Sequence, residues 1–312
     1  MPGSVLLLTD ARADRHASPG HPERPARREA AAQGVRDAAG DRLAEEAPDV
    51  ATDADIARIH DAGYVELLGE AEARGGGWLD ADTYLVPGSL GAARLAAGAT
   101  LRAARAAGSG EAEVAFAAVR PPGHHAAAMR GSGFCLLNSV AIAAAGLRAD
   151  GIARRLAIVD WDVHHGDGTQ AIFHGDGDLL YTSTHQYPFY PGTGSGADTG
   201  GGVARNRPLL AGDGDGAFVA AWRDELLPAI EAFEPEAILV SAGYDAHAAD
   251  PLAELAVTES GYEAVARELG ATAARLGLPG VALTLEGGYD LEALRASTAA
   301  SVRGLIRGRE GA

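Results

Sequence analysis

The segment Ile158–Gly168, with the sequence IVDWDVHHGDG, shows most clearly what kind of fold and site this chain forms. An apolar run that starts at Leu156 leads into it, and three aspartates and two histidines follow within a few positions. Side chains alternate between faces along a strand, so we expect Asp160, Asp162 and His164 on the same face. Three ligand-type groups on one face where a strand ends predict a metal site. The alternative is an ordinary ion pair between an aspartate and a histidine.

The rest of the chain repeats this pattern of short apolar runs, which alternate with alanine-rich helical stretches. The alternation predicts an α/β fold with a mostly parallel central sheet and helices on both faces. The expected strands are Val5–Leu8, Val114–Val119, Leu156–Val159, Leu179–Ser183, Ala237–Val240 and Val281–Leu285. The expected helices include Pro25–Ala39, Ser89–Ala107, Ser139–Arg148, Phe218–Phe233, Gly261–Leu276 and Leu291–Arg307. Glycine-rich Gly192–Gly202 and Gly212–Gly216 are expected to be loops, and the length of residues 1–312 suits one large α/β domain or two ordinary ones.

Composition narrows the class of protein. The chain has 312 residues, 47% of them hydrophobic, which is enough for a large core without disulfides. Its single cysteine, Cys135, fits a reducing compartment, so we expect a cytoplasmic protein. We expect this thiol to be a small buried hydrophobe rather than a histidine-paired nucleophile. No apolar run reaches the roughly 18 residues of a membrane span, and the start lacks the basic region of a secretory signal.

The net charge of −17 is the strongest compositional signal, and all 26 basic residues are arginine. Such acidity argues against direct nucleic-acid binding, which needs a basic face. It would attract a cationic substrate or a basic peptide. The alternative is that the acidity only maintains solubility.

Polar side chains follow five of the predicted strands at the point where each strand ends. In open α/β sheets, ligands bind outside the carboxyl ends of the strands, so these groups are expected around one site. The five segments are Arg120–His125, Asp160–Gly168, His185–Tyr190, Ser241–Asp250 and Glu286–Tyr289.

Adjacent His124 and His125 are candidates for acid–base chemistry. The preceding Pro121-Pro122-Gly123 suggests a rigid turn that directs both rings into one pocket. A carboxylate on the second ring nitrogen fixes the tautomer of a catalytic histidine, and Asp160 and Asp167 are available for this role. The alternative is a pair of surface histidines.

A catalytic metal site needs three protein ligands and an open position. Asp162 and His164 supply two of them, and Asp250, which lies past another strand end, is the candidate for the third. Tyr289 follows two glycines at a fifth strand end, where its phenol would hold the oxyanion of a tetrahedral intermediate. Taken alone, a tyrosine after two glycines is more often a packing residue.

The chain resembles the histone deacetylase superfamily, most closely its class II-like bacterial deacetylases and its acetylpolyamine amidohydrolases. The resemblance runs in order through most of the chain and implies an arginase/deacetylase-like α/β fold with one catalytic domain. It rests on the segments His21–Pro25, Arg120–His125, Gly133–Cys135, Asp160–Gly168, Pro191–Gly194, Ser241–Pro251 and Glu286–Tyr289.

The resemblance also implies roles for individual residues. It assigns the catalytic Zn²⁺, with Fe²⁺ as an alternative, to Asp162, His164 and Asp250. It makes His125, paired with Asp167, the general base and later the acid, and it gives His124, paired with Asp160, an electrostatic role. Tyr289 would stabilise the oxyanion.

Further positions match the family's substrate channel and its structural K⁺ site. The substrate-binding residues that it implies are Phe134, Tyr190, Gly133, Asp82 and Leu252. Tyr190 stands where phenylalanine is common. The K⁺ ligands that it implies are backbone oxygens of Asp160, Asp162 and His164 together with Ser183 and Thr184.

These features predict a zinc-dependent amidohydrolase that removes an acyl group, with acetyl as the expected one, from lysine side chains of a peptide or protein or from similar amines. Gly166 replaces the last aspartate of the Asp-x-His-x-Asp pattern of two-metal relatives, so one metal ion is expected. The first alternative is an acetylpolyamine amidohydrolase. Leu252 disfavours it because an acidic gatekeeper is expected there, whereas nearby Glu254 favours it. The second alternative is a non-catalytic acyl-lysine or metal-binding module. The prediction includes no membrane partner and leaves the oligomeric state open, a homo-oligomer included.

Overall fold

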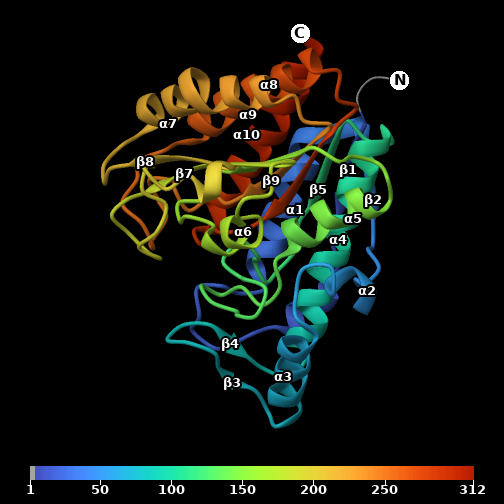
Figure 1. The fold of residues 1–312 in the computed structure, drawn as a ribbon. Helices are drawn as coiled ribbons and strands as arrows, with labels where there is room; N and C mark the ends of the chain where they lie inside the picture. The colour runs from blue at the N-terminus through green and yellow to red at the C-terminus, as the bar shows by residue number, and fades with distance from the viewer. Residues whose placement is uncertain (1–3) are drawn as a thin grey trace.

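A computed structural model describes residues 4–312, and an eight-stranded sheet runs through its centre (Figure 1). The strand order is β2-β1-β5-β10-β9-β6-β7-β8, and each neighbouring pair is parallel. The bounds are β1 Val5–Leu8, β2 Leu43–Glu46, β5 Val114–Ala117, β6 Leu156–Asp160, β7 Leu179–Gln186, β8 Ala204–Leu209, β9 Ala237–Ala242 and β10 Val281–Leu285. A separate antiparallel pair consists of β3 Gly77–Trp78 and β4 Tyr84–Leu85.

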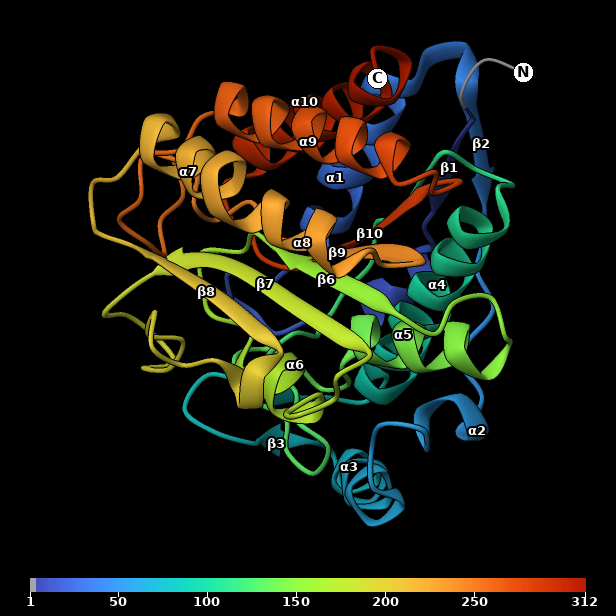
Figure 2. The same ribbon diagram turned by 45° about the horizontal axis from the view of Figure 1, so that its top comes forward.

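Helices cover both faces of the sheet (Figures 1 and 2). Helices α1, α7, α8, α9 and α10 lie over one face, and α4, α5 and α6 lie over the other. The predicted α/β class with a mostly parallel sheet is therefore confirmed. The helix bounds are α1 Ala26–Ala39, α2 Asp53–Ile56, α3 Ala62–Ala73, α4 Ser89–Ser109, α5 Ser139–Ala149, α6 Asp167–Ile172, α7 Asp215–Ala221, α8 Leu227–Phe233, α9 Glu259–Arg275 and α10 Leu291–Glu310. Short 3-10 turns occupy Ala11–Arg15, Gly40–Arg42 and Gly200–Gly202.

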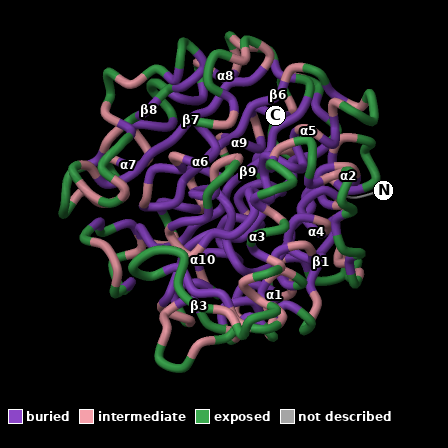
Figure 3. The backbone as a smooth tube through the Cα atoms, turned by 60° about the horizontal axis from the view of Figure 1, so that its bottom comes forward, coloured by how far each residue is buried: buried purple, intermediate pink, exposed green. Residues whose placement is uncertain are grey.

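The core is divided by the sheet, because successive strand residues point to opposite faces. In β1, Val5 and Leu7 pack with the helices α1, α9 and α10, whereas Leu6 and Leu8 pack with α4 and α5. A third, smaller cluster joins α2, α3 and β4 to α4. Figure 3 shows the buried residues concentrated along the strands and the exposed residues at the periphery. No helix in the described part of the chain is long and apolar enough to cross a membrane.

The helix expected over Phe218–Phe233 is continuous in space but contains an irregular turn. Its central residues Trp222–Leu226 form a π-helical turn between α7 and α8. Pro228 has no backbone N–H to continue the regular hydrogen-bond pattern, and a π turn accommodates such an interruption. Another difference lies at the start of α7, since Asp215 and Gly216, which were expected in a loop, are helical.

Candidate active site

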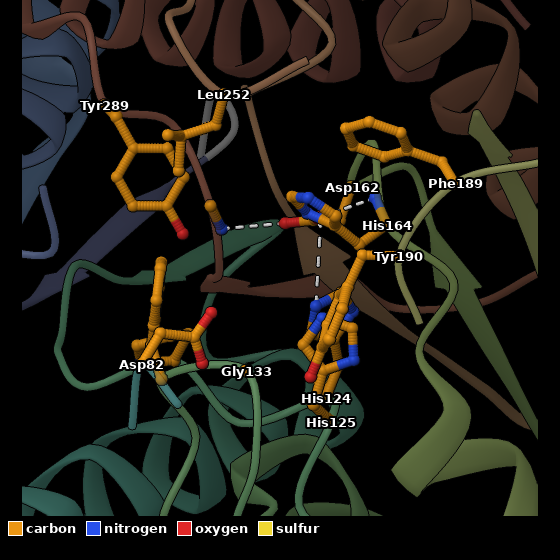
Figure 4. Close-up of a pocket in the computed structure, with 13 residues that line it drawn as sticks. Asp82, His124, His125, Gly133, Asp162, His164, Phe189, Tyr190, Leu252 and Tyr289 are labelled. Carbon is orange, nitrogen blue, oxygen red and sulfur yellow. Dashed lines mark hydrogen bonds and ion pairs between the residues drawn. The ribbon is translucent and has the colours of Figure 1, made fainter. Parts of the chain in front are cut away.

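A pocket of about 230 Å³ opens at the carboxyl edge of the sheet (Figure 4). It receives residues from the segments that follow β5, β6, β7, β9 and β10, as the strand-end argument predicts, and one residue from the turn between β3 and β4. Its lining consists of Asp82, Pro122, His124, His125, Gly133, Phe134, Asp162, His164, Phe189, Tyr190, Leu252, Gly287 and Tyr289.

Each of the adjacent histidines is hydrogen-bonded to its own carboxylate. His124 Nδ1 lies 3.0 Å from Asp160 Oδ2, and His125 Nδ1 lies 2.8 Å from Asp167 Oδ1. The turn that carries them is held by Glu286, whose Oε2 accepts the backbone N–H groups of Gly123 and His124. The Nδ1 atoms are thus engaged, and the Nε2 atoms are the nitrogens left for the pocket.

The two rings differ in their electrostatic surroundings. Burial and then the charge of His124 lower the pKa of His125 to about 4, against the opposing effect of Asp167. Burial also acts against the charged form of His124, but the carboxylates of Asp160 and Asp162 hold the pKa of His124 well above its ordinary value. At neutral pH the pair therefore comprises one neutral imidazole, which can accept a proton, and one imidazolium.

Three further groups converge beside these rings. A carboxylate oxygen of Asp162, a ring nitrogen of His164 and a carboxylate oxygen of Asp245 all lie within 4.8 Å of one another. His164 Nδ1 is 3.1 Å from Asp162 Oδ1 and 3.2 Å from Asp245 Oδ2. The other oxygens are held in place, since Asp162 Oδ2 accepts the N–H of Gly287 and Asp245 Oδ1 accepts that of Val163.

This group fits a metal ion. Asp245 Oδ2 is buried and accepts no hydrogen bond of acceptable geometry from any described residue. Burial opposes protonation of His164, yet the two carboxylates raise its pKa to about 10, so the position favours a positive charge. A β-carbon at Gly243 or Gly287 would collide with the Asp162 carboxylate, so both glycines leave room for this side chain. One nitrogen and two carboxylate oxygens suit Zn²⁺ and also Fe²⁺.

Asp250, the predicted third ligand, lies outside this group. Its Oδ2 accepts the N–H of Tyr289 at 2.6 Å, and its Oδ1 accepts the N–H of Leu252 at 3.0 Å. Burial and then the charge of Asp245 raise the pKa of Asp250 to about 7. The structure thus brings Asp162 and His164 together as expected and adds Asp245 in the place expected for Asp250.

Gly166 fits tightly in its position. A β-carbon there would collide with the Asp160 carboxylate and lie 2.7 Å from the hydroxyl oxygen of Tyr181. That hydroxyl already donates to Asp160 and accepts the N–H of Gly166. A side chain at this position, where two-metal sites carry an aspartate, would therefore require the Asp160 and Tyr181 side chains to move.

Tyr289 lies across the pocket from the histidines, and its phenol oxygen points into the cavity (Figure 4). Burial holds the pKa of this phenol well above its ordinary value, so it stays protonated and can donate a hydrogen bond. The Arg27 guanidinium lies 4.6 Å from the centre of the Tyr289 ring and donates to the carbonyls of Glu286 and Gly288. Arg27 therefore fixes both the ring and the backbone that leads to it.

Aromatic side chains form the walls of the pocket. Phe134 packs edge-on against Tyr289 with ring centres 5.8 Å apart, and Tyr190 packs edge-on against His125 at 5.2 Å. Gly133 has a φ of +54°, and a β-carbon there would collide with the His125 ring. Asp82 and Leu252 also line the pocket, so all five predicted substrate-binding residues lie around it.

The residues of the predicted K⁺ site lie at neighbouring strand ends. Asp160 in β6 is paired with Ser183 in β7. The Ser183 hydroxyl lies 2.8 Å from His185 Nδ1, and the Thr184 hydroxyl accepts the indole N–H of Trp222. None of these contacts shows whether an ion binds here, so the K⁺ site stays a prediction. Cys135 is fully buried, as expected, and burial raises the pKa of its thiol well above the ordinary value.

Sequence reasoning did not assign two residues that contribute to this site. Asp245 follows the end of β9 in a segment that was expected at the pocket, so its strand-end position was the available signal. Phe189 lines the pocket and stacks on His164 with ring centres 5.6 Å apart. Its only signal was its position next to Tyr190.

Comparisons with known proteins agree with this geometry. The histone deacetylase domain family matches residues 21–305. A probable deacetylase of Archaeoglobus fulgidus is 41% identical over 282 residues, which cover 88% of this chain and 78% of that protein. A histone deacetylase-like amidohydrolase of Pseudomonas aeruginosa is 39% identical over 244 residues, covering 77% of this chain and 64% of that protein. The crystal structure of the HDA15 HD domain superposes with a TM-score of 0.90 at 35% identity and covers 97% of this chain and 90% of that one.

Proposed function

The chain belongs to the histone deacetylase family, and from this premise we propose that it is a metal-dependent amidohydrolase that removes an acetyl group from lysine side chains. One observation carries the proposal: two histidines, each on its own carboxylate, face a buried phenol across a pocket that also contains a candidate metal site. These are the parts that metal-assisted amide hydrolysis needs. The fold alone would not specify this chemistry.

His125 is the proposed general base. Its hydrogen bond to Asp167 leaves Nε2 as the nitrogen that faces the pocket, and its low pKa keeps the ring neutral at pH 7. It takes a proton from the attacking water molecule and later delivers that proton to the leaving amine. Asp167 holds the ring in the tautomer that both transfers require.

Asp162 and His164 are the proposed metal ligands, and an oxygen from Asp245 or Asp250 completes the set. The arrangement in the structure favours Asp245, and the family resemblance favours Asp250. A divalent ion supplies Lewis acidity and lowers the pKa of water, and Zn²⁺ and Fe²⁺ both accept these ligands.

Tyr289 and His124 stabilise the negative charge that develops on the substrate. The neutral phenol of Tyr289 donates a hydrogen bond to the oxyanion that develops on the substrate. The His124 imidazolium, held by Asp160, adds a fixed positive charge in a buried setting where it is weakly screened.

The test is hydrolysis of a fluorogenic acetyl-lysine amide by protein loaded with Zn²⁺, Fe²⁺ or Co²⁺. We expect turnover that a chelator abolishes and that added metal restores. Failure to hydrolyse any acylated amine at full metal occupancy would overturn the proposal and leave a binding module as the alternative.

An acetylpolyamine amidohydrolase is the second candidate, favoured by the Asp82 carboxylate at the pocket and by the net charge of −17. Competition between an acetyl-lysine peptide and acetylputrescine or acetylspermidine separates the two substrates. The substrate with the larger kcat/KM in the mixture identifies the preferred class.

A further inference from the structure

We propose that the exposed indole of Trp78, together with the carboxylates of Asp80 and Asp82, binds a positive charge on the substrate, separate from the neutral amide that is cleaved. The chemical group would be an ammonium or a guanidinium. This inference rests on the proposed amidohydrolase function and adds a specificity site to it.

A row of aromatic rings connects Trp78 to the pocket. Phe134, which packs against Tyr289 inside the pocket, has its ring centre 4.7 Å from that of His21. The His21 ring centre is in turn 6.3 Å from that of Trp78. Trp78 is nevertheless 60% exposed, although an indole is usually well covered. An exposed tryptophan at the end of a row that leads to the catalytic groups is placed to contact the outer part of a bound substrate.

The ring between them is held in one orientation. His21 Nδ1 accepts the backbone N–H of Glu23 at 3.0 Å, and its Nε2 lies 3.0 Å from the backbone oxygen of Asp82. Since Nδ1 is an acceptor, Nε2 carries the hydrogen and donates to that oxygen. His21 therefore anchors the segment that carries Asp82 to the base of the aromatic row.

Hydrogen bonds hold the segment between β3 and β4 in a defined turn. Asp80 Oδ1 accepts the backbone N–H groups of Asp82 and Thr83, and the N–H of Leu79 donates to the Thr83 carbonyl. The Thr83 hydroxyl accepts the N–H of Phe134, which ties the segment to the pocket wall. Trp78 and the two aspartates are thus presented at a fixed distance from the pocket, so little order would be lost on binding.

The charge of this rim favours a cation. Burial and then the neighbouring Asp80 carboxylate raise the pKa of Asp82, so the two acids repel each other. A bound cation would relieve this repulsion and face the electron-rich surface of the indole. Figure 4 shows the Asp82 carboxylate directed into the same space as the Tyr289 phenol.

The opposite rim offers no equivalent. Leu252 is apolar, and the Glu254 carboxylate is engaged by the Gln186 side chain at 3.2 Å. Among the described residues that line the pocket, Asp82 and Asp162 alone carry carboxylates, and Asp162 is 1% exposed. A cationic group on the substrate would therefore be directed to the Trp78 side.

The test compares substrates with and without a cationic group apart from the amide that is cleaved. One pair is an acetyl-lysine peptide with a neighbouring arginine or citrulline, and the other is N-acetylputrescine or N-butylacetamide. We expect wild-type protein to favour the charged member of at least one pair. Trp78→Ala should reduce kcat/KM for the charged member by roughly two- to fivefold, the size of an exposed cation–π contact, and leave the neutral member unaffected. Asp80→Asn should reduce the same preference, and more so at low ionic strength.

Two further variants serve as controls. Trp78→Phe keeps an aromatic ring and should retain part of the preference. Leu210→Ala removes another exposed apolar side chain, 65% exposed and outside the pocket lining, and should change neither substrate. A preference within the peptide pair identifies a basic peptide as the source of the charge, and one within the putrescine pair identifies a polyamine. Equal loss for charged and neutral substrates in Trp78→Ala, or no charge preference in wild-type protein, would overturn the inference.

A readout without catalysis separates this inference from the proposed function. Trp161 and Trp222 are 1% and 0% exposed, so acrylamide quenching of tryptophan fluorescence reports mainly on Trp78. We expect 1,4-diaminobutane to protect wild-type fluorescence, 1,4-butanediol to have no effect, and Asp80→Asn to weaken the protection. Protection without hydrolysis would refute the amidohydrolase alone, whereas hydrolysis without protection or charge preference would refute the cation site alone.

Discussion

Replacing Glu23 with glutamine should destabilise the whole fold, because Glu23 neutralises buried arginines beneath the catalytic turn. Its side chain is fully buried and accepts Arg120 Nε at 2.8 Å and Nη2 at 2.5 Å. Arg27 Nη1 lies 3.3 Å away, and the Tyr84 hydroxyl donates at 3.2 Å. Burial raises the pKa of Glu23, but the charges of Arg120 and its neighbours lower it further than burial raises it, so the side chain is a carboxylate.

The expected size of the effect follows from this burial. Glu23→Gln leaves the shape unchanged but turns an amide N–H₂ toward guanidinium donors and leaves buried positive charge uncompensated. Breaking a buried ion pair in this way costs about 3–5 kcal/mol of unfolding free energy. For 312 residues, an unfolding entropy of about 2.1 cal/mol/K per residue gives about 0.66 kcal/mol/K. The midpoint of thermal unfolding should therefore fall by about 5–8 °C.

Differential scanning calorimetry of the wild-type and variant proteins measures this shift directly. The matched control is Glu70→Gln, which breaks a surface pair with Arg74 at 3.4 Å whose side chains are both more than half exposed. That change should cost about 0.3–0.5 kcal/mol, or less than about 1 °C. Adding Arg120→Met to Glu23→Gln should cost less than the sum of the two single changes, because the unpaired charge is removed. A fall for Glu23→Gln no larger than that for Glu70→Gln would refute the reasoning.

Three other outcomes can be checked. Tyr289→Phe should keep metal content and thermal stability while lowering kcat by about 10²- to 10³-fold, the effect of removing one oxyanion donor, and undiminished turnover would remove Tyr289 from the mechanism. Asp245→Asn and Asp250→Asn should differ in Zn²⁺ affinity in a chelator competition. The geometry predicts the larger loss for Asp245→Asn, and a larger loss for Asp250→Asn would make Asp250 the ligand. The contribution of three buried histidines to stability in urea should be fully present above about pH 6.5 and be lost as the pH drops towards 4, because burial lowers their folded-state pKa and the unfolded chain then binds more protons. The folded-state pKa values are about 4, 4 and 3 for His16, His60 and His185. Replacing one of these histidines with glutamine should flatten the slope of stability against pH. An unchanged slope would contradict the assignment.

Hydrophobic runs in the sequence predicted the interior of the sheet and failed at its edges. All six predicted strands are interior strands, which are covered on both faces and therefore read as unbroken apolar runs. The two edge strands were not predicted. β2 consists of Leu-Ala-Glu-Glu with no fully buried residue, and β8 alternates buried and exposed positions and contains Pro208. Proline and charge are tolerated at an edge and protect it from pairing with other chains, so the properties that make these strands good edges also conceal them in the sequence.

The same division appears in the site. The pairs His124–Asp160 and His125–Asp167 join groups at the carboxyl ends of β5 and β6, and the strand-end argument placed these groups at one edge of the sheet although β10 and β9 lie between the two strands. Asp245 and Asp250 both follow β9, and spacing along the chain does not determine which carboxylate turns toward His164. That choice depends on which backbone N–H groups each carboxylate accepts, and these become known only when the loops are folded. Trp78 gave no signal at all, because its position matters only through contacts with residues far away in the sequence.

The tight fit around Gly166 also restricts how this site can evolve. An aspartate at this position, as a second metal would require, would displace the Asp160 carboxylate that orients His124 and crowd the Tyr181 hydroxyl. The substitution that adds a ligand therefore damages the existing site unless Tyr181 has already been replaced by a smaller residue. Loss of Tyr181 alone removes a buried hydrogen bond to Asp160 and brings no benefit of its own. A change from one metal to two would therefore pass through an intermediate in which the contacts of Asp160 with His124 and Tyr181 are disturbed.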